Sequence, residues 1–148
     1  MVSSPLGIYV GCQNSHIIKL FHVSNFNLIT QIDISNSVAR VLSNQDAIIR
    51  QHKSACLRVT TLLHVKDILF VGTSAGVIIT VRDCNPMGLL QGHTGHVRFL
   101  TSVESNVNES QVLVISGGDG FEDFSVVNHN NQEGREDSTN HLLIWQVL

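Results

Sequence analysis

The sequence predicts an all-β fold of four-stranded antiparallel sheets, and two observations lead to this prediction. First, apolar residues make up 43% of the chain and are mostly Val, Ile and Leu, a composition that favours strands because β-branched side chains pack well on a pleated surface. Second, these residues occur in short runs separated by small and polar residues, which is the pattern of strands and turns. The 148 residues are a usual length for one domain.

One two-strand pattern occurs three times along the chain. Each copy is a short apolar run that ends in small residues, followed by a turn and a second apolar run. The copies lie at residues 8–21, 69–81 and 113–145. The spacing between Gly72 and Ser116, which end the first run of the last two copies, fits a β-propeller blade of about 40–45 residues. Gly11 and Gly72 are further apart, which predicts an inserted loop at residues 43–54.

These copies divide the chain into one complete blade and two incomplete ones, because a blade has four strands. Residues 1–42 form a partial first blade with strands at 8–13, 16–23 and 27–34. Its inner strand is missing unless 2–6 or 37–42 supplies it. Residues 55–91 form a full blade with strands at 57–65, 68–73, 77–83 and 87–91. Residues 92–148 form the last blade, with strands at 96–103, 111–117 and 141–147, an acidic loop at 128–140 and no outer strand.

The last blade carries the landmarks of a WD40-like repeat. Gly92-His93 precedes its first strand, Ser-Gly-Gly-Asp-Gly ends its second, and its third contains Trp145. In such blades a His, a Ser, an Asp and a Trp form a structural hydrogen-bond set. The matching residues are His93, Ser116, Asp119 and Trp145, and Asp119 is expected to accept a hydrogen bond from His93. The turns are expected to use glycine for its positive φ, at Gly72, Gly76, Gly117, Gly118 and Gly120.

The full blade before it has no such set. Val81 stands where the Trp would be, and no Gly-His pair precedes Arg58. Packing alone is therefore expected to hold this blade together.

Between two and three blades are fewer than the four to eight of a closed propeller. An open stack leaves apolar faces and strand edges uncovered. We therefore interpret residues 1–148 as the C-terminal portion of a larger propeller, with Met1 as an internal methionine of a longer product. The alternative is a complete β-sandwich of about ten strands.

The candidate polar residues could also be interpreted as a catalytic site, a metal site or a phosphate-binding site. Ser116, His93 and Asp119 could form a hydrolase triad, but no G-x-S-x-G nucleophile elbow is present. His93 and His96 lack further ligands at the spacing of a zinc site, and the Gly-rich turn at 117–120 lacks the lysine of a phosphate-binding loop. The sequence therefore predicts a protein that is not an enzyme and has no catalytic residue, cofactor, metal or small-molecule substrate.

Charge and cysteine usage narrow the partners and the compartment. Eight basic and four acidic side chains precede residue 101, against one basic and eight acidic after it. The basic residues are scattered, which gives no support for nucleic-acid binding. No apolar run approaches the length of a transmembrane segment, and three cysteines without a CxxC pair indicate reduced thiols in the cytoplasm. The expected partners are proteins, among them the rest of the parent chain.

Several stretches resemble the C-terminal WD40-like propeller of large Rho guanine nucleotide exchange factors, and also that of leucine-zipper JNK-interacting scaffold proteins. They are 57–63, 69–77, Gly92-His93 with Val97 and Phe99-Leu100, 114–124, and 141–147. Glu122 before Asp123 favours the exchange factors. The resemblance implies a non-catalytic protein-interaction or regulatory module in small-GTPase signalling, because in that group exchange is carried by a Dbl-homology domain that this chain lacks. The alternative parent is a JNK-pathway scaffold and motor adaptor, which coiled-coil heptads upstream would indicate.

Overall fold

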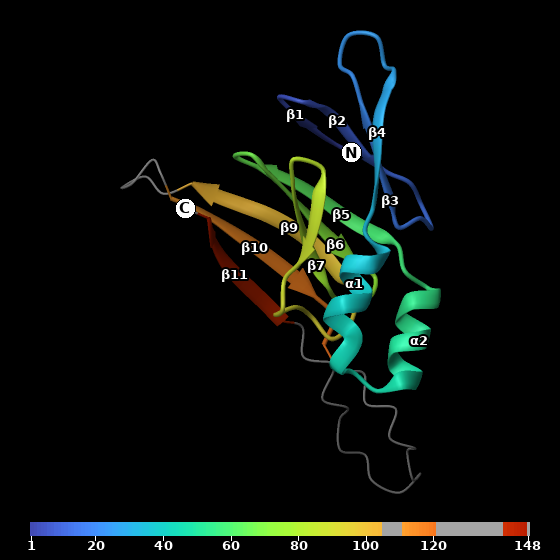
Figure 1. Ribbon diagram of the computed structural model, residues 1–148. Coiled ribbons are helices and arrows are strands. Elements are labelled where there is room, and N and C mark those ends of the chain that lie inside the picture. The colour runs from blue at the N-terminus through green and yellow to red at the C-terminus, as the bar shows by residue number, and fades with distance from the viewer. Residues whose placement is uncertain (105–110, 121–140, 148) are drawn as a thin grey trace, which may run out of the picture.

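The chain forms three antiparallel sheets and two short helices in the computed structural model, which describes residues 1–104, 111–120 and 141–147 (Figure 1). The first sheet has the order β1 (Val2–Ser4), β2 (Gly7–Gly11), β3 (Ile17–Phe21), β4 (Leu28–Asp33). The second has the order β5 (Val59–Val65), β6 (Ile68–Thr73), β7 (Ile78–Arg82), β8 (Asn85–Gly88). The third has the order β11 (His141–Val147), β10 (Val112–Gly118), β9 (Val97–Glu104). The expected all-β architecture is confirmed, and three consecutive sheets replace the two of the alternative sandwich.

The second sheet lies between the other two, and each of its faces is covered. One buried cluster joins it to the first sheet, with Leu20 and Ile79 among its members, and another joins it to the third, with Ile78 and Val114. This position explains why β6 is a nearly continuous apolar run, since a strand buried on both faces has no polar side.

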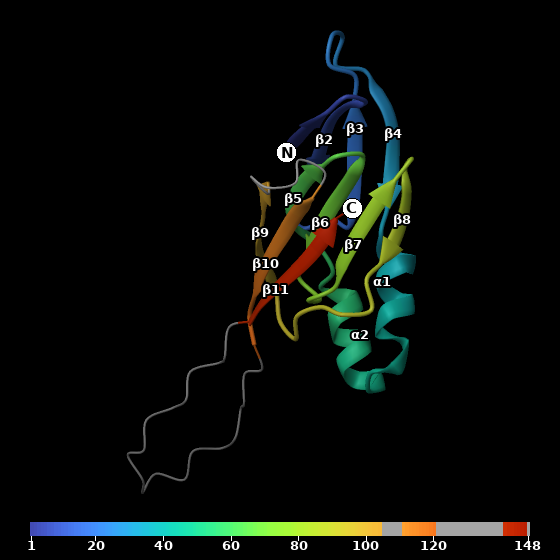
Figure 2. The same ribbon diagram turned by 90° about the vertical axis from the view of Figure 1, so that its left-hand side faces the viewer.

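The first strands of the three sheets lie together. β5 contacts β1 on one side and β9 on the other, and the sheets fan outward from these strands (Figure 2). This is the arrangement of consecutive propeller blades around an axis. The stack is not closed.

The segment between the first two sheets differs from the prediction. Residues 2–6 do supply the inner strand, as β1, whereas 37–42 falls mostly in helix α1 (Ser35–Val41). The predicted loop at 43–54 instead contains the end of the 3-10 turn η1 (Leu42–Asn44) and most of helix α2 (Ala47–Ala55). The cause is local, because the Asp46 side chain accepts a hydrogen bond from Ile48 N at 2.9 Å and so caps α2. The predicted acidic loop at 128–140 lies outside the described residues.

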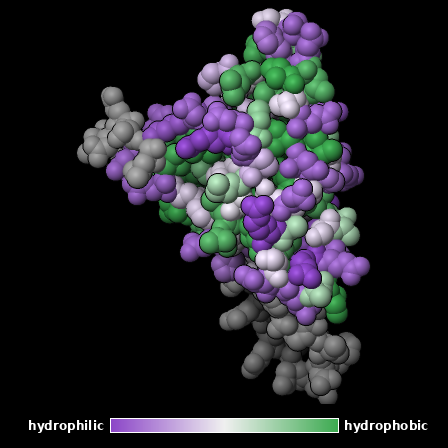
Figure 3. Space-filling model, in the orientation of Figure 1, coloured by the Kyte–Doolittle hydropathy of each residue, from purple (hydrophilic) through white to green (hydrophobic). Residues whose placement is uncertain are grey.

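The third sheet leaves one face and one edge uncovered by the described residues. Alternate residues along its strands point to that face, and Val103, Leu113, Leu142 and Ile144 are exposed there. In the view of Figure 3, apolar patches also lie between polar ones over the sheet of β1–β4. Within the described residues, neither helix has the length and apolar character needed to cross a membrane.

Candidate functional site

Two side chains from different parts of the chain converge on the hydroxyl of Ser116 in the middle of the third sheet. Trp145 Nε1 donates to Ser116 Oγ at 3.2 Å, and His93 Nε2 lies 2.9 Å from the same oxygen. Ser116 is 0% exposed and His93 is 7% exposed. The structure therefore brings three of the four predicted residues together around a hydroxyl that is shielded from solvent.

The backbone explains how these residues meet. Ser116 on β10 pairs with Leu143 on β11, so Trp145 is its diagonal neighbour two residues further along. His93 lies in the segment between β8 and β9, and its N–H donates to Gly76 O in the β6–β7 turn at 2.9 Å. His93 thus links the second sheet, through its backbone, to the third sheet, through its ring.

Asp119 does not accept a hydrogen bond from His93, so this part of the expectation was wrong. Its carboxylate instead binds Arg98, whose Nε lies 2.8 Å from Oδ1 and whose Nη2 lies 2.6 Å from Oδ2. A guanidinium is always charged and presents two parallel donors that match a carboxylate. A largely buried imidazole offers neither, so Arg98 is the better partner for Asp119. Within the described part of the chain, the buried Nδ1 of His93 has no hydrogen-bond partner.

Electrostatics reinforce this separation into a neutral and a charged pair. Burial lowers the pKa of the His93 imidazole, the nearby His141 lowers it further, and Asp119 opposes the shift. The hydrogen bond from Arg98 lowers the pKa of the Asp119 carboxyl. Near neutral pH, His93 is therefore neutral beside Ser116, and Asp119 is ionised beside Arg98.

The five glycines predicted for turns do not all lie in turns. Gly76 does lie in a turn with a φ of +83°, and a Cβ there would meet the carbonyl oxygen of His93. Gly72 lies inside β6, and Gly117 and Gly118 lie inside β10. Gly118 is required for a different reason than its φ, because a Cβ would clash with the His93 ring. Gly120 follows β10 and is buried.

The geometry does not favour hydrolysis. Ser116 is fully buried, and the carboxylate that would orient His93 is bound to Arg98 instead. A triad needs its acid on the second nitrogen of the histidine, and no described residue forms a hydrogen bond with that nitrogen of His93. Among the described residues, no group of three His, Cys, Asp or Glu side chains is placed to hold a metal ion.

Side-chain hydrogen bonds also hold the second sheet together, contrary to the expectation that packing alone does so. Ser74 Oγ donates to Cys56 O at 2.9 Å and accepts from Arg58 N at 3.0 Å. Thr73 Oγ1 donates to Val77 O at 2.7 Å within the β6–β7 turn. Serine in this turn therefore secures the segment that enters β5.

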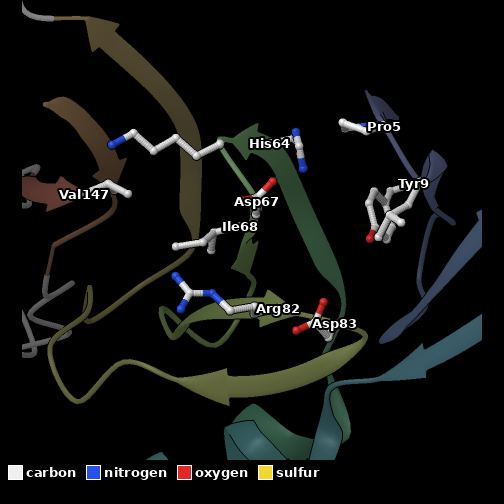
Figure 4. A pocket seen from close by; sticks show the side chains of 10 residues that line it. Pro5, Tyr9, His64, Asp67, Ile68, Arg82, Asp83 and Val147 are labelled. Atoms are coloured by element: carbon white, nitrogen blue, oxygen red, sulfur yellow. The ribbon is translucent and has the colours of Figure 1, made fainter. Parts of the chain in front are cut away.

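A cavity of about 470 Å³ lies at the C-terminal end of β5 and is bordered by all three sheets (Figure 4). Tyr9 comes from the first sheet and stacks on His64 with ring centroids 6.4 Å apart. Burial raises the pKa of the Tyr9 hydroxyl. The charged side chains of the lining are two basic and two acidic, namely Lys66, Arg82, Asp67 and Asp83. Their charges balance, so the cavity selects for no particular ligand charge.

Comparison with known proteins agrees with this geometry. Three antiparallel sheets fanning from their first strands define a segment of a β-propeller. Residues 1–145 match the family described as LRRK2 beta propeller, and the chain belongs to this family.

Relatives with longer sequences match nearly the whole chain. It is 38% identical to "Rho guanine nucleotide exchange factor 17" of Homo sapiens, over 99% of this chain and 10% of that protein. It is 28% identical to "Rho guanine nucleotide exchange factor osg-1" of Caenorhabditis elegans, over 84% of this chain and 12% of that protein. A "JNK-interacting protein" of the same species is 22% identical over 95% of this chain and 17% of that protein. The resemblance drawn from the sequence is confirmed, and the chain spans about a tenth of the length of the exchange factors it matches.

Arg98 is the member of the site that the sequence analysis missed. It lies near the start of β9, two residues after His96, and binds Asp119, which directly follows the neighbouring strand β10. A charge search would have paired the two only if it had assumed that β9 and β10 are neighbours, as the blade pattern itself predicts.

Proposed function

We propose that the chain is a non-catalytic interaction or regulatory module in small-GTPase signalling, as the C-terminal portion of a WD40-like propeller in a Rho guanine nucleotide exchange factor. The observation that carries this proposal is 38% identity over 99% of the chain with Rho guanine nucleotide exchange factor 17. The polar residues with the best geometry support it, because they fasten sheet to sheet and present no accessible nucleophile.

The exposed apolar faces support the interaction role. Leu142 is 67% exposed and Ile144 is 66% exposed on the free face of the third sheet. Apolar patches of this kind favour association, here with further blades of the parent or with another protein. The three cysteines are free thiols, which agrees with a cytoplasmic location.

A JNK-pathway scaffold as parent is the second candidate, supported by the 22% identity to a JNK-interacting protein. The higher identity to the exchange factors favours the first candidate. Sequence upstream of Met1 discriminates between them, since a Dbl-homology domain marks one and coiled-coil heptads mark the other.

Nucleotide release from a purified Rho GTPase tests the function directly. The chain alone is expected to leave the release rate unchanged. Added to Rho guanine nucleotide exchange factor 17 from which the matching region has been deleted, the chain is expected to bind and to change the exchange rate. Exchange activity of the chain alone would contradict the proposal, and so would the absence of both binding and effect in the second experiment.

A further inference from the structure

A second cavity, of about 270 Å³, lies at the other end of β5 from the cavity of Figure 4. Three segments line it, one from each sheet: the β2–β3 turn, the start of β5 and the start of β9. Its lining residues are Gln13, Asn14, Arg58, Val59, Thr60, His96, Val97 and Arg98. It is smaller than a usual small-molecule pocket, and its size suits one side chain of a partner.

The charge of this cavity has a single sign. Two arginines and a histidine line it, and none of the described residues in the lining is acidic. Asp119 compensates Arg98 from outside the lining. The Arg58 guanidinium, by contrast, has no ion pair or side-chain hydrogen bond with any residue in the described ranges. Arg58 is therefore available to an anionic ligand.

Thr60 supplies an independent sign that a ligand belongs here. Its Oγ1 is buried and has no hydrogen-bond partner among the described residues. Buried hydroxyls are nearly always hydrogen-bonded, so an exception calls for an explanation. Thr60 borders the cavity, and rotation about its Cα–Cβ bond can turn the shielded hydroxyl toward an oxyanion bound there, to which it can donate its proton.

Two β-bulges place side chains around this cavity. The pairing of β5 with β6 runs from Val59↔Thr73 to Thr61↔Gly72 and so skips Thr60. The pairing of β9 with β10 likewise skips Arg98, between Phe99↔Gly117 and Val97↔Gly118. Bulges redirect side chains out of the strand alternation and are common beside functional sites.

The backbone around the cavity is held in place before any ligand binds. Val59 N donates to Ser15 O at 2.9 Å, which ties the β2–β3 turn to β5. Ser74 binds the N–H of Arg58 through its side chain and the carbonyl of Arg58 through its own N–H. A site organised in this way loses little conformational freedom on binding.

We propose that this cavity binds an oxyanion carried by a protein partner, either a phosphate monoester or the carboxylate of an acidic peptide, through Arg58 and the Thr60 hydroxyl. The inference rests on the proposed role as an interaction module and assigns it a site. Failure at this cavity would leave that role intact, because the apolar faces and the exchange assay test it separately.

Fluorescence anisotropy with three labelled peptides tests the proposal on the whole chain. The peptides share one Gly/Ser-rich sequence and carry a central phosphoserine, three glutamates or an unmodified serine. The first, the second or both are expected to bind and the third is not, and their order of affinity identifies the natural oxyanion. Inorganic phosphate is expected to compete with the phosphoserine peptide, and binding is expected to weaken with salt.

Two variants and a matched control make the result specific. Arg58→Gln is expected to weaken binding by about tenfold to a hundredfold, since a charged hydrogen bond is lost, and Thr60→Val by about threefold to tenfold. Arg82→Gln changes the net charge equally but lies in the other cavity, and it is expected to bind as the wild type does. Circular dichroism confirms that each variant is folded.

A measurement on the unmodified chain guards against variants that fail to fold. In a two-dimensional NMR titration, the phosphoserine peptide is expected to shift the amide signals of residues 13–14, 58–60 and 96–98. Shifts confined elsewhere, no binding of either anionic peptide at millimolar concentration, equal losses in Arg58→Gln and Arg82→Gln, or unchanged binding in Thr60→Val would each overturn the proposal.

Discussion

Replacing Ser116 with alanine removes the oxygen on which the Trp145 and His93 side chains converge. Among the described residues, Ser116 is the one side chain that either group contacts by a hydrogen bond, the Trp145 N–H at 3.2 Å and the His93 Nε2 at 2.9 Å. Because Ser116 is 0% exposed, water does not readily take its place. Leaving a buried donor or acceptor unsatisfied costs about 1–3 kcal/mol, and Trp145 is only partly buried. The expected loss in the free energy of unfolding is therefore about 2–4 kcal/mol.

Urea unfolding followed by tryptophan fluorescence measures this loss at the site itself, because Trp145 is the single tryptophan of the chain. Ser102→Ala is the matched control, since it makes the same chemical change at an exposed position of the same sheet. The control is expected to change stability by less than about 0.5 kcal/mol. Low protein concentration limits association through the free face of the third sheet.

A double-mutant cycle of Ser116→Ala with Trp145→Phe isolates the hydrogen bond from the packing of the ring. Its four proteins are unfolded in urea and followed by circular dichroism, because Trp145→Phe removes the single tryptophan of the chain. Phenylalanine keeps most of the apolar contact and removes the N–H. The two substitutions are expected to be non-additive by at least about 0.5 kcal/mol, because Trp145→Phe removes a donor that Ser116→Ala has already left unpaired. Strict additivity, or a cost for Ser116→Ala no larger than for Ser102→Ala, would refute the reasoning.

Three further outcomes are expected. The pKa of His93 is lower in the folded state than its ordinary 6.5, so the unfolded chain binds more protons than the folded chain as the pH falls. The free energy of unfolding should therefore decrease as the pH drops below about 6.5. Urea midpoints measured across this range should change less with pH in His93→Gln than in the wild type. Asp119→Asn and Arg98→Gln should couple by at most about 1 kcal/mol in a salt-sensitive way, because Arg98 is 63% exposed in this pair, and a larger, salt-insensitive coupling would contradict this. Gly76→Ala should lower the unfolding free energy by at least about 1 kcal/mol because of its positive φ, and thermal melts should show a smaller loss for Gly11→Ala.

The strands were predictable because their signals are local. The run Ile68–Thr73 is apolar at nearly every position and ends in Gly-Thr, which marks a strand buried on both faces wherever it stands in the fold. The segment between the first two sheets was harder to interpret, since Val38 and Leu42 are apolar residues that suit a strand or a helix equally. They are four residues apart and both buried, which is the helical spacing. Asp46 is a helix-capping residue that could have predicted the start of α2. The blade spacing led instead to the prediction of an inserted loop.

The partners within the site depended on tertiary structure and were only partly predictable. Ser116, His93 and Trp145 followed from the blade pattern, because that pattern fixes which strands are neighbours. The pattern also makes β9 and β10 neighbours, but the partner of Asp119 was missed, because Arg98 lies at a bulge where the regular alternation of the strand does not predict the direction of its side chain. The same holds for Thr60, whose bulge breaks the alternation of β5.

The second and third sheets use different residues to hold the segment that precedes their first strand. In each, the segment that enters the inner strand must be held against a turn or strand of its own sheet. Ser74 does this for β5 by binding Cys56 and Arg58 through their backbones, and Ser116 does it for β9 by binding the ring of His93. The first solution needs only a serine in the right turn, so it leaves no Gly-His or Trp in the sequence. A blade that lacks the WD40 landmarks can therefore still be held together by side-chain hydrogen bonds. In this chain the hydrogen bonds of Ser74 also hold the backbone of Arg58, which lines the cationic cavity.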